Sequence, residues 1–273
     1  MISQSVINPK YFMRRCMIVF MLSGLTGTGF GESEFNKNKV FIHKPSLSHP
    51  VATLVLCPGQ NGSSEEAINN KAWTQFAEQE HLALVGYHFE SPDSLLEAGK
   101  GYFVAERGSG KALLQGIEKA DLANEPLFLY GFSGGAHFAM SFAAWAPEKI
   151  AGFCAYSFAW SSPPPQTLRC PALIVCGEAD GKRYASTLQY FQEGRRQRNP
   201  WTWISLGGQE HAPSSELDAF VREYLACLTR KNRHPVIVDN ITKQIVKQGD
   251  SDIRYSVLPS ESLLASWRQL HHP

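Results

Sequence analysis

Ser133 stands at the centre of the pattern Gly-x-Ser-x-Gly, which runs from Gly131 to Gly135. The pattern follows a short apolar run at 127–130 and precedes an Ala-rich stretch that ends before Pro147. A sharp turn between a buried strand and a helix exposes a serine hydroxyl at the end of a sheet, and flanking glycines relieve the crowding there. The pattern is common by itself, but this position favours a nucleophilic serine.

A serine nucleophile needs a base, and the base needs a carboxylate to orient it. In the order serine, acid, histidine, the next acid is Asp180, just beyond an apolar run at 172–176, with Glu178 as the alternative. His211 lies in a glycine-rich loop after the apolar run 202–206. Each residue follows the carboxyl end of a predicted strand, and such ends meet at one edge of a parallel sheet. The sequence therefore predicts a Ser133, His211 and Asp180 triad.

Acyl transfer also needs two backbone N–H groups that converge on the developing oxyanion. One comes from the residue after the nucleophile, and the other comes from a loop after an earlier strand. Gly134 would supply the first of these groups. The loop 58–62, which follows the apolar run 51–57, would supply the second through Gln60. The alternative for this loop is a plain turn between strand and helix.

The elements that must position these residues alternate along the chain. Continuous apolar runs predict buried strands, and a 3.6-residue apolar period predicts amphipathic helices. Together they indicate one α/β domain with a mostly parallel central sheet and helices on both faces. The predicted strands are at 38–43, 51–57, 82–89, 127–130, 150–156, 172–176 and 202–206, and the predicted helices are at 63–77, 113–120, 133–145, 184–191 and 217–228.

Four segments resemble the serine α/β-hydrolases: 56–60, the elbow 130–135, 177–180 and 208–211. They are most similar to small secreted esterases of the polyester-depolymerase and feruloyl-esterase type. The resemblance covers roughly 38–228 and implies an α/β-hydrolase fold with an eight-stranded sheet. It also implies that the chain cleaves carboxylic esters through an acyl-enzyme with no metal or organic cofactor. Pro58-Gly59 replaces the His-Gly of many members, which leaves the geometry of this loop open.

The elbow lacks the Tyr-Gly-Gly of many prolyl-oligopeptidase-like peptidases, which favours esters over peptides as substrates. The alternatives are a serine peptidase or thioesterase on the same fold, and a binding protein that keeps the fold with an idle triad. The connection 157–171 contains Ser161 to Pro165 and is too short and stiff for a helical lid. Phe158 and Trp160 could line the substrate pocket or simply belong to the core. Such an open site suits a small ester or the protruding ester of a polymer.

The first 31 residues resemble a secretory signal. Lys10, Arg14 and Arg15 precede the apolar run 16–22, small residues follow, and no acidic residue occurs before position 32. The run is too short to predict a stable membrane span. We expect export to the periplasm or medium, or a cytoplasmic location if the segment is not a signal. A strand followed by a dinucleotide-binding loop at 27–29 is the alternative, but Glu32 stands where the motif requires glycine.

The remaining composition excludes some functions. The chain has 273 residues, 43% of them hydrophobic, with a formal net charge of +1, so no basic field points to nucleic acid. The cysteines match neither a zinc site nor a disulfide framework, and we expect buried free thiols. Residues 32–228 form the predicted hydrolase domain. Residues 229–273 form an appendage packed on it, with a small hairpin from 236–238 and 253–257 and with Trp267 as a packing anchor.

Overall fold

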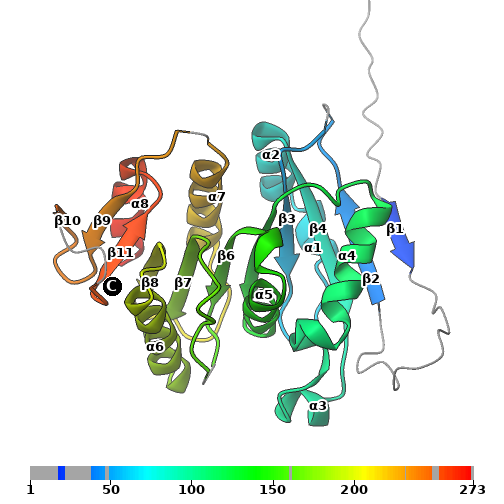
Figure 1. Cartoon of the computed structure of the whole chain (residues 1–273), viewed down its shortest axis with the longest axis horizontal. Coiled ribbons are helices and arrows are strands. Elements are labelled where there is room, and N and C mark those ends of the chain that lie inside the picture. Colours follow the sequence, from blue (N-terminus) through cyan, green and yellow to red (C-terminus); the bar gives the residue numbers. More distant parts are fainter. Residues whose placement is uncertain are drawn as a thin grey trace, which may run out of the picture.

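The fold is given by a computed structural model that describes residues 18–21, 38–46, 49–159, 162–230, 232–247 and 252–271. The large sheet consists of β1 (Ile18–Met21), β2 (Asn38–His43), β3 (Ala52–Cys57), β4 (Leu82–Phe89), β5 (Leu127–Phe132), β6 (Ile150–Tyr156), β7 (Ala172–Gly177) and β8 (Trp201–Leu206). Its strand order is β1-β2-β4-β3-β5-β6-β7-β8 (Figure 1).

Strands β3 to β8 are parallel to their neighbours, whereas β2 runs antiparallel to β4 and β1 antiparallel to β2. Every residue of β3, β7 and β8 is buried. Burial on both faces explains why these strands are continuous apolar runs rather than alternating ones. Each predicted strand forms, and the main difference is that β5 extends through Phe132 up to Ser133.

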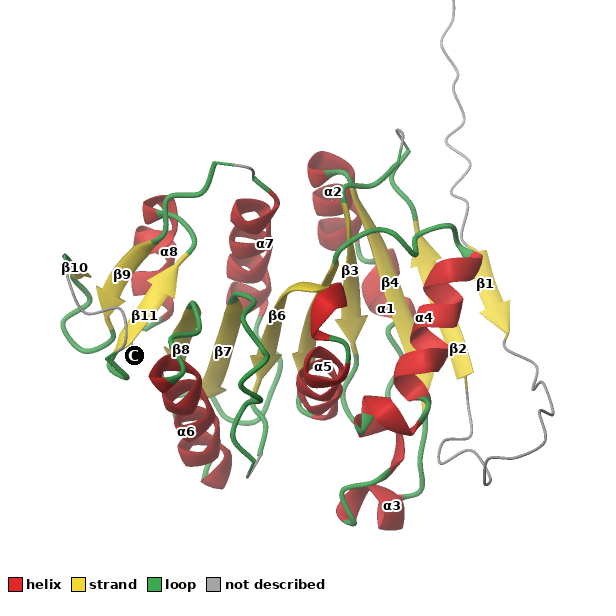
Figure 2. Cartoon of the chain, in the orientation of Figure 1, coloured by secondary structure: helices red, strands yellow, loops and turns green. Residues whose placement is uncertain are grey.

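Helices cover both faces of the sheet. They are α1 (Glu65–Asn69), α2 (Lys71–Glu80), α3 (Asp93–Glu97), α4 (Ser109–Lys119), α5 (Gly134–Trp145), α6 (Lys182–Arg196), α7 (Ser215–Thr229) and α8 (Leu264–Leu270), with short 3-10 turns η1 (Gly101–Phe103), η2 (Ala105–Arg107), η3 (Pro147–Lys149) and η4 (Glu261–Leu263). Helices α4, α5 and α6 lie in front of the sheet in Figure 2 and bury Leu113, Phe138 and Phe191. Helices α2 and α7 bury Trp73 and Phe220 in a separate cluster on the other face. The predicted fold class is confirmed.

The helix predicted at 63–77 is two helices in the structure, α1 and α2. Asn70 has an extended ψ of 131°, and its side chain accepts a hydrogen bond from Ala72 N. Asn70 therefore ends α1 and caps α2. The Ser64 hydroxyl makes no capping bond; it donates to Leu56 O at 2.5 Å instead. The apolar stripe continues across the break, which is why the sequence pattern looked like one helix.

The connection from β6 to β7 has no helix in its described residues, 157–159 and 162–171. Such parallel connections usually contain a helix that covers the sheet. The prediction of a minimal lid is therefore confirmed for these residues. In Figure 1 the described residues of this connection run as an irregular segment between α5 and α6.

The C-terminal segment contributes β9 (Val236–Asp239), β10 (Ile245–Val246) and β11 (Tyr255–Leu258). The expected pairing of 236–238 with 253–257 is confirmed, because β9 and β11 are antiparallel neighbours, and β10 pairs on the other side of β9. Side chains from this segment satisfy backbone groups of the edge strand β8. Ser256 Oγ accepts from Trp203 N at 2.8 Å, and Trp267 Nε1 donates to Trp203 O at 2.9 Å. These bonds protect an edge that could otherwise pair with another chain.

Replacing Trp267 with alanine is expected to lower the free energy of unfolding by about 3–5 kcal/mol, because the side chain is fully buried and its hydrogen bond would also be lost. Urea denaturation followed by fluorescence measures the change. The matched control is Ile241→Ala, since Ile241 is 74% exposed and its loss should matter little. Equal, small effects of both substitutions would mean that the C-terminal segment does not stabilise the domain.

Four residues of the predicted signal peptide are described, and they form the edge strand β1. The rest of residues 1–31, with the rejected dinucleotide loop at 27–29, lies outside the described residues. Cleavage near Gly31 would remove β1 and leave β2 paired with β4. The signal peptide and export remain predictions. In the part of the chain that is described, no helix has the length and apolar character to cross a membrane.

Candidate active site

Ser133 occupies a strained turn between β5 and α5. Its backbone has φ 53° and ψ −117°, a conformation that is uncommon for a residue with a side chain. A Cβ atom on Gly131 would lie 2.2 Å from the carbonyl carbon of Gly135, and one on Gly135 would lie 2.1 Å from Cys57 O. Both glycines are therefore required by close backbone contacts. The Ser133 N–H donates to Tyr156 O at 2.9 Å and ties the turn to β6.

His211 connects the serine to the acid. Its Nε2 lies 3.0 Å from Ser133 Oγ, and its Nδ1 lies 2.9 Å from Asp180 Oδ2. The carboxylate opposite Nδ1 favours a proton on that nitrogen, which leaves Nε2 to accept from the serine hydroxyl. The structure thus brings together the three residues predicted from the sequence. Asp180 is 31 positions from His211 along the chain, and Ser133 is 78 positions from it.

Asp180 is the carboxylate that contacts His211. Its side chain is 2% exposed, and its other oxygen accepts from Arg183 Nη1 at 3.2 Å. Burial raises the pKa of Asp180, but hydrogen bonds with His211 and Ser157 and the positive charges of His211 and Arg183 outweigh it. The resulting pKa is below its ordinary value of 3.8. Asp180 is therefore ionised at neutral pH.

The alternative acid, Glu178, points elsewhere. Its carboxylate accepts from Ser205 Oγ at 2.7 Å, and Tyr184 Oη lies 3.0 Å from the same hydroxyl. Residues 178 and 180 differ in exposure as well, since Glu178 is exposed and Asp180 is buried. The structure thus places Asp180 beside the imidazole and leaves Glu178 in a surface hydrogen-bond network.

Backbone bonds hold the acid loop against the histidine loop. Ala179 N donates to Gln209 O at 3.0 Å, and Glu178 N donates to Leu206 O at 3.0 Å. A Cβ on Gly177 would lie only 2.2 Å from Gln209 O, so glycine allows this close approach. Beyond His211, the Tyr156 hydroxyl donates to Ala212 O at 2.6 Å. These contacts determine the position of the imidazole ring.

The loop 58–62 lies directly over the start of α5. A Cβ on Gly134 would lie 2.7 Å from Gln60 N, so the two backbone amides expected to bind an oxyanion are neighbours. Asn61 has a positive φ of 53°, which asparagine tolerates better than most residues. Its N–H donates to Tyr102 Oη at 2.9 Å, and its side chain exchanges two hydrogen bonds of 3.1 Å with the backbone of Ser91.

Residues near the site that sequence reasoning missed lie mainly in 90–108. Tyr102 supports the loop 58–62 through its hydrogen bond with Asn61. Phe103 packs against Gly134, since a Cβ added to Gly134 would lie 2.8 Å from Phe103 Cε1. This segment consists of α3 and the short turns η1 and η2, so it has no hydrophobic period that could be recognised. The adjacent aromatic pair was the one available signal.

Phe158 and Trp160 are the two aromatic residues expected to line the substrate pocket. Phe158 is fully buried in the core, its ring edge-on to Tyr190 at 5.5 Å, so no part of it is open to a substrate. The expectation that Phe158 lines the substrate pocket is therefore wrong, and the alternative that it belongs to the core is confirmed, because its ring packs against Tyr190 and His137. Trp160 lies outside the described residues.

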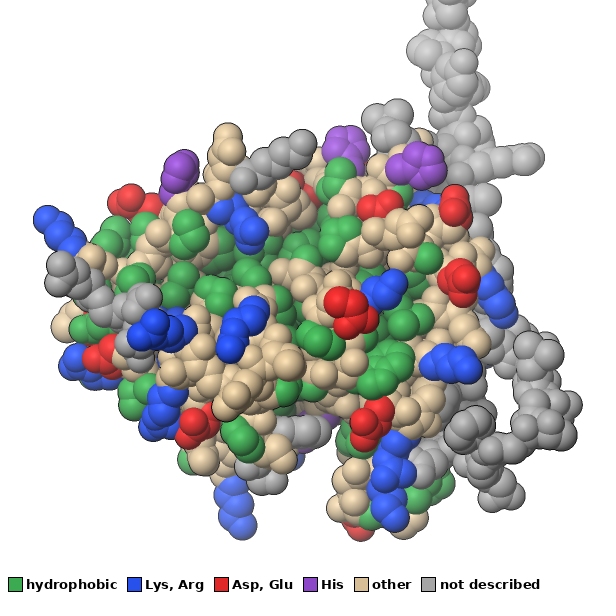
Figure 3. Space-filling model, viewed as in Figure 1, with side chains coloured by type: hydrophobic (Ala, Val, Ile, Leu, Met, Phe, Trp, Pro, Cys, Tyr) green, Lys and Arg blue, Asp and Glu red, His purple; other side chains and the backbone are tan. Residues whose placement is uncertain are grey.

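The space around the candidate triad is open. A cleft of about 520 Å³ lies beside His211 and is lined by Asp180, Arg183, Lys182 and Glu210, among others. Figure 3 shows a notch at the lower rim, between the part with α3 and the part with α6, at the edge to which the parallel strands point. Ligands of open α/β sheets bind beyond this edge.

The described residues contain no group of three or more His, Cys, Asp or Glu side chains that could hold a metal ion. Cys57, Cys154, Cys170, Cys176 and Cys227 are free, and all except the half-buried Cys170 are buried. This confirms the prediction of free thiols for these five residues. Burial raises the pKa of the Cys154 thiol well above its ordinary value, so this side chain is not a reactive thiolate.

Comparisons with known proteins give matches only at the level of structure. No protein-family model matches the chain, and no curated protein matches it. Solved structures do. S-formylglutathione hydrolase from Staphylococcus aureus aligns with a TM-score of 0.57 and 14% identity over 79% of this chain and 98% of that chain. Fluorophosphonate-binding serine hydrolase F from the same organism aligns with a TM-score of 0.56 and 12% identity, over 80% of this chain and 99% of that chain. Dienelactone hydrolase from Anabaena variabilis aligns with a TM-score of 0.55 and 14% identity, over 78% of this chain and 95% of that chain.

The chain has the α/β-hydrolase fold. In α/β-hydrolases the nucleophile, the acid and the histidine follow one another along the chain, and a backbone N–H after the nucleophile faces one from an earlier loop. Ser133, Asp180 and His211 stand in this order, and Gln60 lies in the loop after β3. The candidate site of this chain is therefore located where the α/β-hydrolase fold carries its chemistry.

Proposed function

We propose that the protein is a serine hydrolase that cleaves carboxylic esters through an acyl-enzyme. The observation that supports this proposal is the hydrogen-bond chain from Ser133 through His211 to Asp180, at the start of a helix and beside the amides of Gln60 and Gly134. A nucleophile, a base with its orienting acid and an oxyanion site are the parts that acyl transfer requires.

In the proposed mechanism His211 Nε2 takes the proton of Ser133 as Oγ attacks the acyl carbon. Asp180 holds the imidazole and stabilises its charged form. The N–H groups of Gln60 and Gly134 bind the negative oxygen of the tetrahedral intermediate. His211 then returns the proton to the leaving alcohol. A water molecule, activated by His211, attacks the acyl-enzyme and releases the acid. The reaction uses no metal or organic cofactor.

The substrate class is an ester of a small molecule or the accessible ester of a polymer. An open cleft and a β6–β7 connection whose described residues form no helix support access to the site for either kind of substrate. The names of the similar structures include a lactone hydrolase and an S-formylglutathione hydrolase. Thioesters therefore belong in the substrate panel together with oxygen esters and peptides.

The test combines covalent labelling with turnover. A fluorophosphonate probe should label the protein at Ser133, as located by peptide mass spectrometry, and p-nitrophenyl acetate should be hydrolysed. Labelling without turnover of any ester would favour a peptidase or thioesterase on the same site. Absence of both labelling and turnover would contradict the proposal and favour a binding protein with an idle triad.

A further inference from the structure

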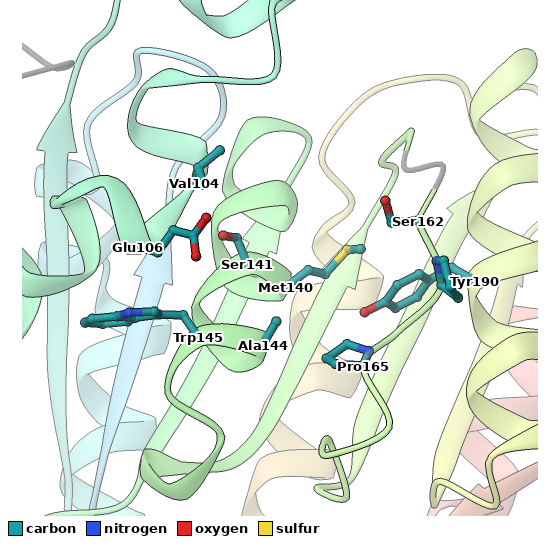
Figure 4. A pocket seen from close by; sticks show the side chains of 10 residues that line it. Val104, Glu106, Met140, Ser141, Ala144, Trp145, Ser162, Pro165 and Tyr190 are labelled. Atoms are coloured by element: carbon teal, nitrogen blue, oxygen red, sulfur yellow. The ribbon is translucent and has the colours of Figure 1, made fainter.

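A pocket of about 300 Å³ lies on the outer face of α5, separate from the cleft at His211 (Figure 4). Its floor is formed by Met140, Ser141 and Ala144 of α5. Its walls include Trp145, Pro165 and Tyr190. The pocket exists because the β6–β7 connection has no helix in its described residues to cover this side of α5.

One wall of this pocket begins beside the nucleophile. On one side, Phe103 packs at Gly134, and the following residues reach the pocket at Val104. Ala105 N donates to Ser141 Oγ at 2.9 Å, which anchors this wall to α5. On the other side, the pocket is lined by Ser162, Pro163 and Pro165. Positions 133, 137, 141 and 144 recur every three to four residues, so they share the face of α5 that leads from Ser133 to the pocket.

His137 lies on α5 between the nucleophile and the pocket. It lies one helical turn after Ser133, and its half-buried ring stacks on Phe103 at 5.5 Å and meets Phe158 edge-on at 6.4 Å. Burial and, secondarily, the charge of Arg183 lower the pKa of His137 to about 4, so the ring is neutral at neutral pH. Glu106, at the rim, is the one charged side chain of the pocket lining. The pocket lining and the imidazole between it and Ser133 are therefore mainly uncharged.

The position of His211 determines which half of a bound ester can extend toward the pocket on α5. His211 precedes α7, which packs on the face of the sheet opposite to α5. The leaving alcohol must face His211 to receive its proton. The acyl half must then extend away from His211, toward the face that carries α5.

We propose that this pocket binds the apolar chain of the acyl group, so that the enzyme prefers esters of medium-chain aliphatic acids. The inference rests on the proposed ester hydrolysis at Ser133. Met140 is seven residues beyond Ser133, which is about 10 Å along the helix axis, and Ala144 is about 16 Å away. An extended octanoyl chain reaches the first of these residues, and a dodecanoyl chain approaches the second. Burial of the added methylenes provides the preference.

The test uses a substitution that narrows the far end of the pocket. Ala144 is exposed in the floor, so Ala144→Phe fills the pocket without disturbing the core. The kcat/KM values of p-nitrophenyl acetate, butyrate, octanoate and dodecanoate are compared below their micelle concentrations. We expect Ala144→Phe to lower the dodecanoate-to-acetate ratio by roughly tenfold. The matched control is Ala219→Phe, at an exposed alanine of α7 on the opposite face, which should keep the wild-type ratio.

A second variant, Val104→Phe, fills the same pocket from the opposite wall and should give the same change if Ala144→Phe does not fold. An unchanged dodecanoate-to-acetate ratio in folded variants overturns the acyl-chain site, while acetate turnover and fluorophosphonate labelling leave the proposed hydrolase standing. A wild-type protein that neither turns over any ester nor accepts the label overturns both proposals. A loss that is equal for acetate and dodecanoate also overturns the site, because it would show general damage.

Discussion

Replacing Ser133 with alanine is expected to lower kcat for p-nitrophenyl butyrate by about 10⁵–10⁶-fold, because the attacking oxygen is lost. His211→Ala should have a similar effect, since a serine hydroxyl without its base is a weak nucleophile. The double variant should be little worse than either single variant, because the two side chains act as one unit. Single-turnover and steady-state kinetics measure these losses.

Neither substitution should damage the fold. The bond from residue 133 to Tyr156 O is made by the backbone N–H and remains in Ser133→Ala. Thermal unfolding of both variants should therefore match that of the wild-type protein within a few degrees. The residual rate should still exceed that in water, because Gln60 N and Gly134 lie together and can bind the oxyanion. A Ser133→Ala protein with near wild-type turnover would place the nucleophile elsewhere.

Asp180→Asn is expected to lower kcat by about 10⁴-fold. An amide is almost the same size as the carboxylate, but it can donate its N–H to His211 Nδ1 and so favour the wrong tautomer of the imidazole. It also cannot stabilise the imidazolium that forms during the reaction. Because the pKa of Asp180 is below its ordinary value, the wild-type carboxylate is ionised throughout a neutral assay.

The matched control for this variant is Glu178→Gln, two residues away on the same loop. Glu178 contacts Ser205 rather than His211, so its neutral variant should keep kcat within about twofold of the wild-type value. A large loss in Glu178→Gln with a small loss in Asp180→Asn would reverse the assignment of the acid. Equal losses would indicate that the loop, rather than one carboxylate, is what matters.

Much of the fold could be predicted because its signals are local. The strands β4 and β6 are continuous apolar runs bounded by polar or turn residues, and they form at 82–89 and 150–156 as predicted. The elbow at Ser133 could be recognised because its glycines are dictated by contacts within the turn and with β3. The break at Asn70 could not, since a stripe of apolar residues continues through it.

Other features depend on contacts between distant residues. Tyr102 is 41 residues from Asn61, whose N–H it accepts, and no periodic pattern marks either residue. The role of the C-terminal segment depends on contacts such as the hydrogen bond from Trp267 to Trp203, which are 64 residues apart. Phe158 could be interpreted as core or as pocket until the packing of α6 showed that it is buried.

The sequence by itself determined the order of strands and helices, the α/β class and the chain order Ser133, Asp180, His211, because hydrophobic period and turn chemistry are properties of neighbouring residues. Only the tertiary structure decided that Asp180 rather than Glu178 faces His211, and that a pocket opens over α5. Both outcomes depend on how loops 177–181 and 207–212 and the segments 103–106 and 162–165 pack in space. Side-chain direction at a strand end follows from that packing, and residue type does not reveal it.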